Sequence, residues 1–505
     1  MNPITTEESP VLPEAALLTF SQALTHAIST LWPDAQAPHI VFEAPRRPEF
    51  GDFATNIALQ LARVAKRSPQ DVATQILDQT FEQAPQLRAL FSDAQAVAGF
   101  INIRLAPICW QHSVARILRD GEHFGKSPDN GTRISLEFGS ANPTGPLLVV
   151  QGRTMSIGQT LANVMRFCGY DVFTEWIIND QGAQMDTLGR SLYARYAQSF
   201  DPAYPFPEDG YPADYLLPLA DAIADTDGEK WMGAAESAWL PHFSKYGRDA
   251  IVTGQQEMAT RFGVQYNLWQ SEAEMHASGR VQADLKRLTD AGLTYEKDGA
   301  LFFKASQFGD DKDRVLVRSD GRTTYYGADI AYHYEKLKRS DRVIDILGPD
   351  HHGYIGRIRG VAEALGFPGQ LEVLISQQIT LMRGNEEVSM SKRSGNIISL
   401  EEIIEEVGVD AARFFFVMLA TDSPLKFDLA LAKEESSNNP VYYVQYGHAR
   451  INSVFQRATA ADAASAAAGH TLASLLDPAE LALARRLSEF PRLLSNVVEH
   501  YAPHR

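Results

Sequence analysis

The sequence predicts an α/β fold, because a strand, a helix and a second strand follow one another directly. Residues 133–138 alternate polar and apolar side chains, as a half-buried strand does. The next regular segment places Ile157, Leu161 and Met165 on one helical face and stops at Gly169. Residues 171–178 then have the pattern of a second strand. Two strands joined through a helix lie parallel with a right-handed crossover, so we expect a parallel sheet covered by helices.

Residues 1–125 are expected to form a smaller α+β domain. Helical periodicity begins near Glu14, and residues 45–52 are rich in turn formers. A second amphipathic helix follows that loop, and residues 96–104 alternate as a single strand.

The rest of the chain divides into a large domain over 126–425 and a helical domain over 426–505. The segment at about 190–300 is rich in Tyr, Pro and Trp and contains amphipathic helices, so we expect an insertion between two halves of the sheet. Strand-like runs then return at 314–318, 342–347 and 371–376.

Composition narrows the functional classes. The 505 residues carry a net charge of -17, which argues against general nucleic-acid binding but allows a local basic face. Two cysteines, Cys109 and Cys168, are too few for a zinc-binding set or a disulfide framework and favour a reducing compartment. The N-terminus lacks the pattern of a signal peptide, and no apolar run is long enough to span a bilayer. We therefore expect a soluble, cytoplasmic protein.

The loop over residues 139–152 is the first candidate ligand site. It follows the first strand of the predicted sheet, and ligands bind beyond the carboxyl ends of parallel strands. The helix that begins there offers free N–H groups to a phosphate. The loop has neither the P-loop spacing nor the glycine spacing of a dinucleotide site.

Eight segments in consistent order resemble those of bacterial arginyl-tRNA synthetases, and PRRPEFGDFATN (45–56) resembles the N-terminal domain of that family. The eight are EFGSANPTGPL (137–147), IINDQGAQM (177–185), DDKDRVLVRSDG (310–321), TTYYGADIAYH (323–333), GPDHHGY (348–354), VSMSKRSGN (388–396), VDAARFFF (409–416) and NPVYYVQYGHARI (439–451). The resemblance implies a Rossmann-type class I synthetase catalytic domain, an N-terminal α+β domain that contacts tRNA and a C-terminal α-helical anticodon-binding domain. It also implies that arginine is joined to ATP, accompanied by Mg²⁺, as arginyl-adenylate and is then transferred to tRNA(Arg).

The residues themselves are consistent with an arginine pocket. Carboxylates bind a planar guanidinium best, through forked hydrogen bonds. Glu137 lies at the carboxyl edge of the sheet, and Asn142 follows it at a distance that suits the α-amino or carboxylate end of an amino acid. Tyr325 and Asp329 are four residues apart and share one helical face. The resemblance assigns all four to arginine, whereas a lone aspartate in such a helix is more often solvated or a cap.

The resemblance also assigns residues to the nucleotide and to tRNA. Lys392 corresponds to the lysine of a mobile loop that stabilises the leaving pyrophosphate. The adjacent histidines His351 and His352 lack a third ligand at metal-binding spacing, so we expect no metal site. Arg46 and Arg47 lie in the loop assigned to tRNA. The residues assigned to the nucleotide are Ser389, Met390, Ser391, Lys392, Asp350 and His351.

One motif departs from the family pattern. Where the family has His-Val-Gly-His, this chain has Leu148, Val149, Val150 and Gln151, and Gln159 replaces a common Asp. The family histidines donate hydrogen bonds to the phosphates of ATP, and the glycine leaves room for adenine. Leu148 cannot donate, Val150 should crowd the base, and the Gln151 amide can replace a donor only in part. We therefore expect impaired adenylate formation.

The chain also stops earlier than the helical bundle of the family. Leu483, Leu487, Phe490 and Leu494 recur at helical spacing and are expected to form one exposed apolar face, available to a protein partner.

Three functional hypotheses remain open. The first is a weak arginine–tRNA ligase, and the second is a catalytically inactive paralogue that binds arginine, tRNA or a protein partner as a sensor or regulator. The third is an enzyme that modifies arginine in the retained amino-acid pocket.

Overall fold

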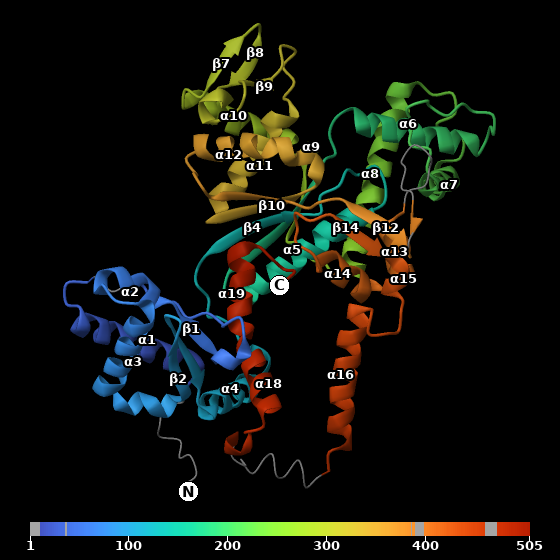
Figure 1. The fold of residues 1–505 in the computed structure, drawn as a ribbon. Helices are drawn as coiled ribbons and strands as arrows, with labels where there is room; N and C mark the ends of the chain where they lie inside the picture. The colour runs from blue at the N-terminus through green and yellow to red at the C-terminus, as the bar shows by residue number, and fades with distance from the viewer. Residues whose placement is uncertain (1–10, 36–37, 385, 389–397, 460–471) are drawn as a thin grey trace. The chain divides into compact units, whose positions relative to one another are not determined.

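The computed structural model describes residues 11–35, 38–384, 386–388, 398–459 and 472–505, and it divides into two units (Figure 1). The first unit comprises Met1–Lys126 and Val454–Leu493, and the second comprises Ser127–Ser453 and Leu494–Arg505. Within the described residues, no helix is both long and apolar enough to cross a membrane.

The first unit packs helices against a three-stranded antiparallel sheet with the order β1-β3-β2. Its core includes the rings of Phe20, Phe81 and Phe91, the centroids of Phe20 and Phe91 being 4.7 Å apart. The elements are α1 (Pro13–Leu31), η1 (Pro48–Phe50), β1 (Phe53–Thr55), α2 (Ile57–Ala65), α3 (Pro69–Gln83), η2 (Pro85–Leu90), β2 (Phe91–Val97), β3 (Phe100–Leu105), α4 (Pro107–Asp120), η3 (Gly121–His123), η7 (Leu472–Ser474) and α18 (Pro478–Ser488).

Two expectations for this unit need correction. The single strand expected over 96–104 is a hairpin, because the chain turns at Ala98 and Gly99, whose φ angles are 50° and 84°. The four leucine and phenylalanine positions near the end do not form one face. The helix ends at Ser488 and a new one begins at Phe490, followed by a proline that cannot continue an earlier helix.

Because the four side chains belong to two helices, they are not equally exposed to solvent. Leu483, Leu487 and Phe490 are exposed, whereas Leu494 is buried in the core of the second unit.

The second unit is built on a five-stranded parallel sheet with the order β11-β10-β4-β5-β6. This confirms the predicted α/β fold, and β4 and β5 have the expected bounds. Its strands are β4 (Arg133–Phe138), β5 (Asp171–Ile178), β6 (Leu268–Ser271), β10 (Arg342–Leu347) and β11 (Leu371–Ile375).

Helix α5 (Val149–Phe167) joins β4 to β5 and packs closely on the sheet. Gly158 allows this approach, because a Cβ atom there would lie 2.1 Å from the ring of Phe138. The buried face of α5 includes the predicted Ile157, Leu161 and Met165.

The unit also contains two smaller sheets and further helices, of which α6, α7 and α8 share a hydrophobic cluster of their own. Strand β6 lies within the segment expected as an insertion and forms one edge of the parallel sheet. The run near 314 pairs in an antiparallel sheet of order β7-β8-β9, and a third sheet has the order β13-β12-β14. These strands are β7 (Thr294–Lys297), β8 (Ala300–Phe303), β9 (Arg314–Val317), β12 (Ile379–Arg383), β13 (Glu386–Glu387) and β14 (Leu425–Asp428). The helices are α6 (Ala183–Gln198), η4 (Asp214–Leu216), α7 (Leu217–Asp227), α8 (Glu236–Arg261), α9 (Glu272–Ala277), α10 (Arg280–Asp290), η5 (Ala305–Phe308), α11 (Tyr325–Arg339), η6 (Pro349–Tyr354), α12 (Ile355–Ala364), α13 (Leu400–Val407), α14 (Val409–Val417) and α15 (Leu429–Ala432). Two further helices, α16 (Pro440–Arg457) and α19 (Phe490–His500), span the sequence boundaries between the units.

Candidate active site

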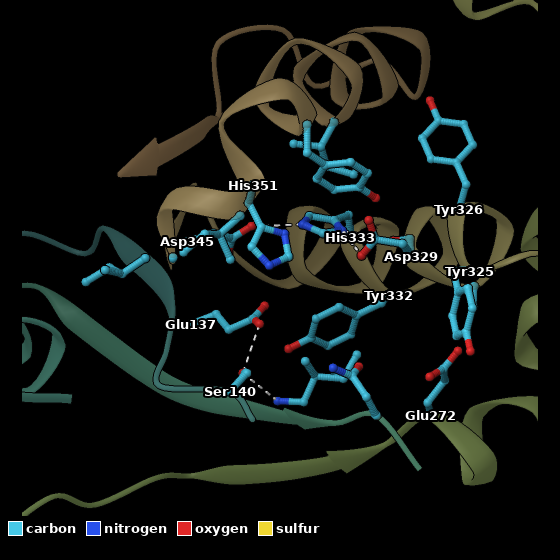
Figure 2. A pocket seen from close by; sticks show the side chains of 18 of the residues that line it. Glu137, Ser140, Glu272, Tyr325, Tyr326, Asp329, Tyr332, His333, Asp345 and His351 are labelled. Carbon is cyan, nitrogen blue, oxygen red and sulfur yellow. Dashed lines mark hydrogen bonds and ion pairs between the residues drawn. The ribbon is translucent and has the colours of Figure 1, made fainter. Parts of the chain in front are cut away.

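A cavity of about 510 Å³ opens at the carboxyl ends of β4, β5 and β10 (Figure 2). Its walls come from the ends of these strands, the start of α5, the start of α9, one face of α11, and η6 with α12. This is the edge at which parallel sheets bind ligands. Five residues predicted for the site line it, namely Glu137, Gln151, Tyr325, Asp329 and His351.

Glu137 is buried at the end of β4 with both carboxylate oxygens occupied. Its Oε1 accepts a hydrogen bond from Ser140 Oγ at 3.1 Å, and its Oε2 accepts one from Lys336 Nζ at 2.6 Å. The same serine Oγ accepts the backbone N–H of Ile177 at 3.1 Å, which ties the loop after β4 to β5. Glu137 is therefore held in one orientation.

Helix α11 presents a row of polar side chains to the cavity. Its N-cap Thr324 accepts the backbone N–H of Gly327 at 3.2 Å, which fixes where the helix begins. Tyr325 and Asp329 lie one turn apart at the cavity, as their spacing predicts. Gly182, with φ of 88°, gives the tyrosine room, because a Cβ atom there would lie 2.7 Å from its hydroxyl oxygen.

Only one of the two carboxylate oxygens of Asp329 has a side-chain partner in the part of the chain that the structure describes. Its Oδ1 lies 3.1 Å from His333 Nδ1, while His333 Nε2 lies 2.8 Å from Asp345 Oδ2. Burial disfavours a charged imidazole, but the two carboxylates outweigh it and raise the pKa of His333 to about 10. The other oxygen of Asp329, Oδ2, is buried and has no hydrogen-bond partner within the described chain. It is available to a donor from a ligand.

Glu272 is a site residue that the sequence analysis missed. It begins α9 directly after β6, is 5% exposed, and its carboxylate lies beside the hydroxyl of Tyr325 in Figure 2. Burial, reinforced by Asp180 and Asp329, raises its pKa to about 7. Its Oε2 also has no hydrogen-bond partner among the residues described. The sequence does offer a signal for Glu272, because it is an acidic residue directly after a strand. That strand lies in the segment that was expected to be an insertion.

Asn142 does not line the cavity and is exposed. Its Oδ1 accepts from Asn179 Nδ2 at 3.3 Å, and Asn179 does line the cavity. Asn142, which was expected to face the amino acid, is therefore separated from the cavity by the side chain of Asn179.

The altered motif begins α5. Val150 and Gln151 line the cavity, whereas Leu148 does not. The Oε1 atom of Gln151 accepts the backbone N–H of Leu148 at 3.1 Å, so this side chain closes the first turn of its own helix. Leu148 also forms an antiparallel bridge with Ser399, and the N–H of Leu400 donates to the carbonyl of the preceding Leu147 at 2.8 Å.

The structure describes only some of the residues that were assigned to the nucleotide. His351 lines the cavity from η6, and Asp350 is exposed beside it without lining it. Ser389, Met390, Ser391 and Lys392 lie outside the described residues.

Arg46 and Arg47 lie in the first unit. Arg46 lines a separate cavity of about 640 Å³ together with Phe50, Asn56 and Gln60. Arg47 is exposed and lies 3.7 Å from Glu49, an exposed pair that contributes little to stability.

Three family models match the chain. They are the arginyl tRNA synthetase N terminal domain over residues 18–105, the class I (R) tRNA synthetase catalytic domain over 238–418, and the DALR anticodon binding domain over 444–505.

Relatives of known name match over most of their length. The chain is 42% identical to the arginine–tRNA ligase of Syntrophotalea carbinolica, covering 93% of this chain and 85% of that protein. It is 39% identical to the arginine–tRNA ligase of Oceanobacillus iheyensis, with coverage of 96% and 87%.

Among solved structures, a putative arginyl-tRNA synthetase from Campylobacter jejuni matches with a TM-score of 0.73 and 30% identity, covering 79% of this chain and 87% of that one. The arginyl-tRNA synthetase of Thermus thermophilus matches with a TM-score of 0.69, at 20% identity and coverage of 96% and 88%, and so supports the fold.

Proposed function

The chain belongs to the arginine–tRNA ligase family, and on that premise we propose that its cavity binds the guanidinium of arginine between Asp329, Glu272 and Tyr325. One observation carries the proposal. Each carboxylate keeps a buried oxygen without a hydrogen-bond partner within the described chain, Oδ2 of Asp329 and Oε2 of Glu272. Buried carboxylate oxygens are costly to leave unpaired, and a guanidinium supplies five donors in a planar fork. Arginine satisfies both oxygens at once.

The charge of the cavity agrees with a cationic side chain. Of the other buried carboxylates near it, Glu137 and Asp345 are paired with Lys336, and Glu175 is paired with Arg339. With His333 protonated, three cations (Lys336, Arg339 and His333) pair with four carboxylates (Glu137, Asp345, Glu175 and Asp329). Arg314 and Arg357, which also line the cavity, both lie against Asp310. Ionised Glu272 adds a further uncompensated negative charge, and bound arginine offsets part of it.

The amino-acid end of arginine belongs at the carboxyl end of β4. We assign the α-amino group to Glu137, which Ser140 and Lys336 already orient. Asn142 reaches the same end through Asn179.

ATP, with its Mg²⁺, is the second substrate that the family implies. We assign its phosphates to the start of α5, because the first turn of a helix leaves N–H groups without intrahelical partners and Val150 and Gln151 of that turn line the cavity. His351 and Asp350 are assigned to its nucleoside, and Ser389, Met390, Ser391 and Lys392 to its phosphates.

Adenylate formation by this chain is expected to be impaired. Leu148 and Gln151 stand where the family has phosphate donors, and the oxygen of Gln151 is engaged in capping α5. Val150 adds a branched side chain to the cavity wall. Loss of one transition-state donor costs about 10²–10³ in rate, so two losses together make turnover very slow.

The tRNA contact is assigned to the first unit. Arg46 and Arg47 supply positive charge beside the cavity that Arg46 lines, and phosphates of tRNA(Arg) are the ligand expected there. We assign residues 1–125 to tRNA contact, residues 126–425 to catalysis and residues 426–505 to anticodon contact.

A second candidate function follows from the contrast between the two halves of the cavity. The carboxylates that face arginine are retained while the nucleotide motif is changed. That pattern suits an inactive paralogue that senses arginine or binds tRNA or a protein partner.

Calorimetry of arginine binding tests the amino-acid assignment. The unmodified chain should prefer arginine to lysine, and Asp329→Ala should weaken arginine binding by about 2–5 kcal/mol, because a buried charge pair loses one partner. Glu274→Ala, an exposed change on α9, is the control and should bind normally. Equal affinities for arginine and lysine would refute the assignment. Measurable tRNA arginylation by the unmodified chain would exclude the inactive paralogue.

A further inference from the structure

A continuous row of buried charges lies beneath the arginine-facing carboxylates. It runs from Glu137 on β4 to Lys336, then to Asp345 on β10, then to His333 and finally to Asp329. Figure 2 shows Glu137, Asp345, His333 and Asp329 of this row. Four members of the row line the cavity, all but Lys336, and Asp345 is the shared partner in its middle. The two cations of the row, Lys336 and His333, have no part in the proposed contacts with arginine.

Lys336 lies behind the cavity wall and is fully buried. Its ammonium donates to Glu137 Oε2 at 2.6 Å and to Asp345 Oδ1, and it lies 4.7 Å from the centroid of the Tyr332 ring. It is not among the residues that line the cavity, so it can influence a ligand only through its cavity-lining partners Glu137, Asp345 and Tyr332. Burial disfavours the ammonium, yet Asp345 and Glu137 outweigh it and keep the pKa of Lys336 above its usual range.

His333 has a carboxylate at each ring nitrogen. Nδ1 lies 3.1 Å from Asp329 Oδ1 and also 2.9 Å from the backbone carbonyl of Asp329, and Nε2 lies 2.8 Å from Asp345 Oδ2 on β10. Only the imidazolium can donate from both nitrogens. The charged groups around it are these two carboxylates and Lys336, and with its pKa near 10 the ring remains charged at neutral pH.

Orientation matters more for arginine than for other cations. A guanidinium is a rigid plane that must meet carboxylate oxygens in a fixed geometry, whereas an ammonium is a compact charge that accepts many geometries. Fixed carboxylates therefore favour arginine over lysine specifically. Mobile carboxylates of the same charge would attract both.

We propose that Lys336 and His333 are positioning residues for amino-acid selection, which hold Glu137 and Asp329 in the orientation that fits arginine by anchoring both to Asp345. The inference rests on the proposed arginine site. On this proposal, the preference for arginine over lysine depends on Lys336 and His333, whereas the attraction of any cation depends on the carboxylates themselves.

The test compares Lys336→Met and His333→Gln with Lys338→Met, an exposed lysine change on the same helix. Calorimetry or competition measures dissociation constants for arginine and lysine in each folded variant. The ratio of the two constants should fall by about tenfold or more in Lys336→Met and His333→Gln, and stay unchanged in Lys338→Met. A role in stability alone would lower the melting temperature without changing this ratio.

The outcomes distinguish the inference from the proposed function. If the unmodified chain binds arginine and lysine equally, the arginine site is wrong and the inference falls with it. If the unmodified chain prefers arginine and both folded variants keep that preference, the inference alone is overturned. Should either variant fail to fold, ring-nitrogen NMR of the unmodified chain decides: a His333 imidazolium at pH 8 supports the two-sided hold, and a neutral ring overturns it.

Discussion

Arginine binding should depend steeply on pH, because Glu272 must be ionised to receive a guanidinium. Its pKa is raised to about 7 by burial and by the neighbouring Asp180 and Asp329. Above that pH the carboxylate is charged and binds arginine. Below it, binding must first release a proton, so affinity is lost as pH falls through about 7.

The size of the effect follows from the ionised fraction. With a pKa of about 7, roughly nine-tenths of Glu272 is ionised at pH 8 and roughly one-tenth at pH 6. The dissociation constant for arginine should therefore rise by about tenfold between these two pH values. Glu272→Gln should bind arginine weakly and show no such slope.

Calorimetry at several pH values, in buffers of different ionisation enthalpy, measures both the affinity and the number of protons released. Two nearby histidines need controls. His276 lies 3.9 Å from Glu272, with its pKa lowered by burial, and His351 lines the cavity. His276→Gln and His351→Gln should keep the slope. A constant affinity from pH 6 to 8, or the same slope in Glu272→Gln, would refute the assignment of Glu272.

Three further predictions can be checked separately. Glu272→Gln should stabilise the arginine-free chain at pH 8, raising its unfolding free energy by roughly 1–3 kcal/mol and with it the melting temperature. A carboxyl with a raised pKa destabilises the fold once it is ionised, so this gain should shrink as pH falls below about 7. The combined change Leu148→His, Val150→Gly and Gln151→His should raise arginine-dependent pyrophosphate exchange by at least about 10², and no gain over the unmodified chain would show that the defect lies elsewhere. Replacing Arg46 and Arg47 by Ala should weaken tRNA binding and make it less salt-dependent; tRNA affinity that stays the same over a salt series would point to another surface.

The parallel sheet was predictable because its signals are local. The alternation over 133–138 and the apolar face of Ile157, Leu161 and Met165 are written within single elements, and the structure has β4 and α5 where they were expected. The hairpin at Ala98 was not predictable from alternation, because a two-residue turn preserves the alternating pattern on both sides.

The site was harder to predict, since its chemistry depends on partners far apart in the sequence. The spacing of Tyr325 and Asp329 correctly placed them on one face of α11. No local pattern shows that Glu137 meets Lys336 across 199 positions, or that Glu272 is buried without a partner for Oε2 in the described chain. Such pairings arise only when strands from distant parts of the chain become neighbours in the sheet.

The side chain of Gln151 has an evolutionary consequence. Because its oxygen accepts the N–H of Leu148, replacing it alone with histidine removes this hydrogen bond at the start of α5, at a cost of about 0.5–1.5 kcal/mol. This single substitution should increase the rate of adenylate formation only slightly while Leu148 and Val150 remain in place. Intermediates that replace Gln151 before the other two residues would then be less stable without being appreciably faster. Selection acting one substitution at a time meets a fitness valley there, so a lineage that acquired this glutamine would tend to keep it.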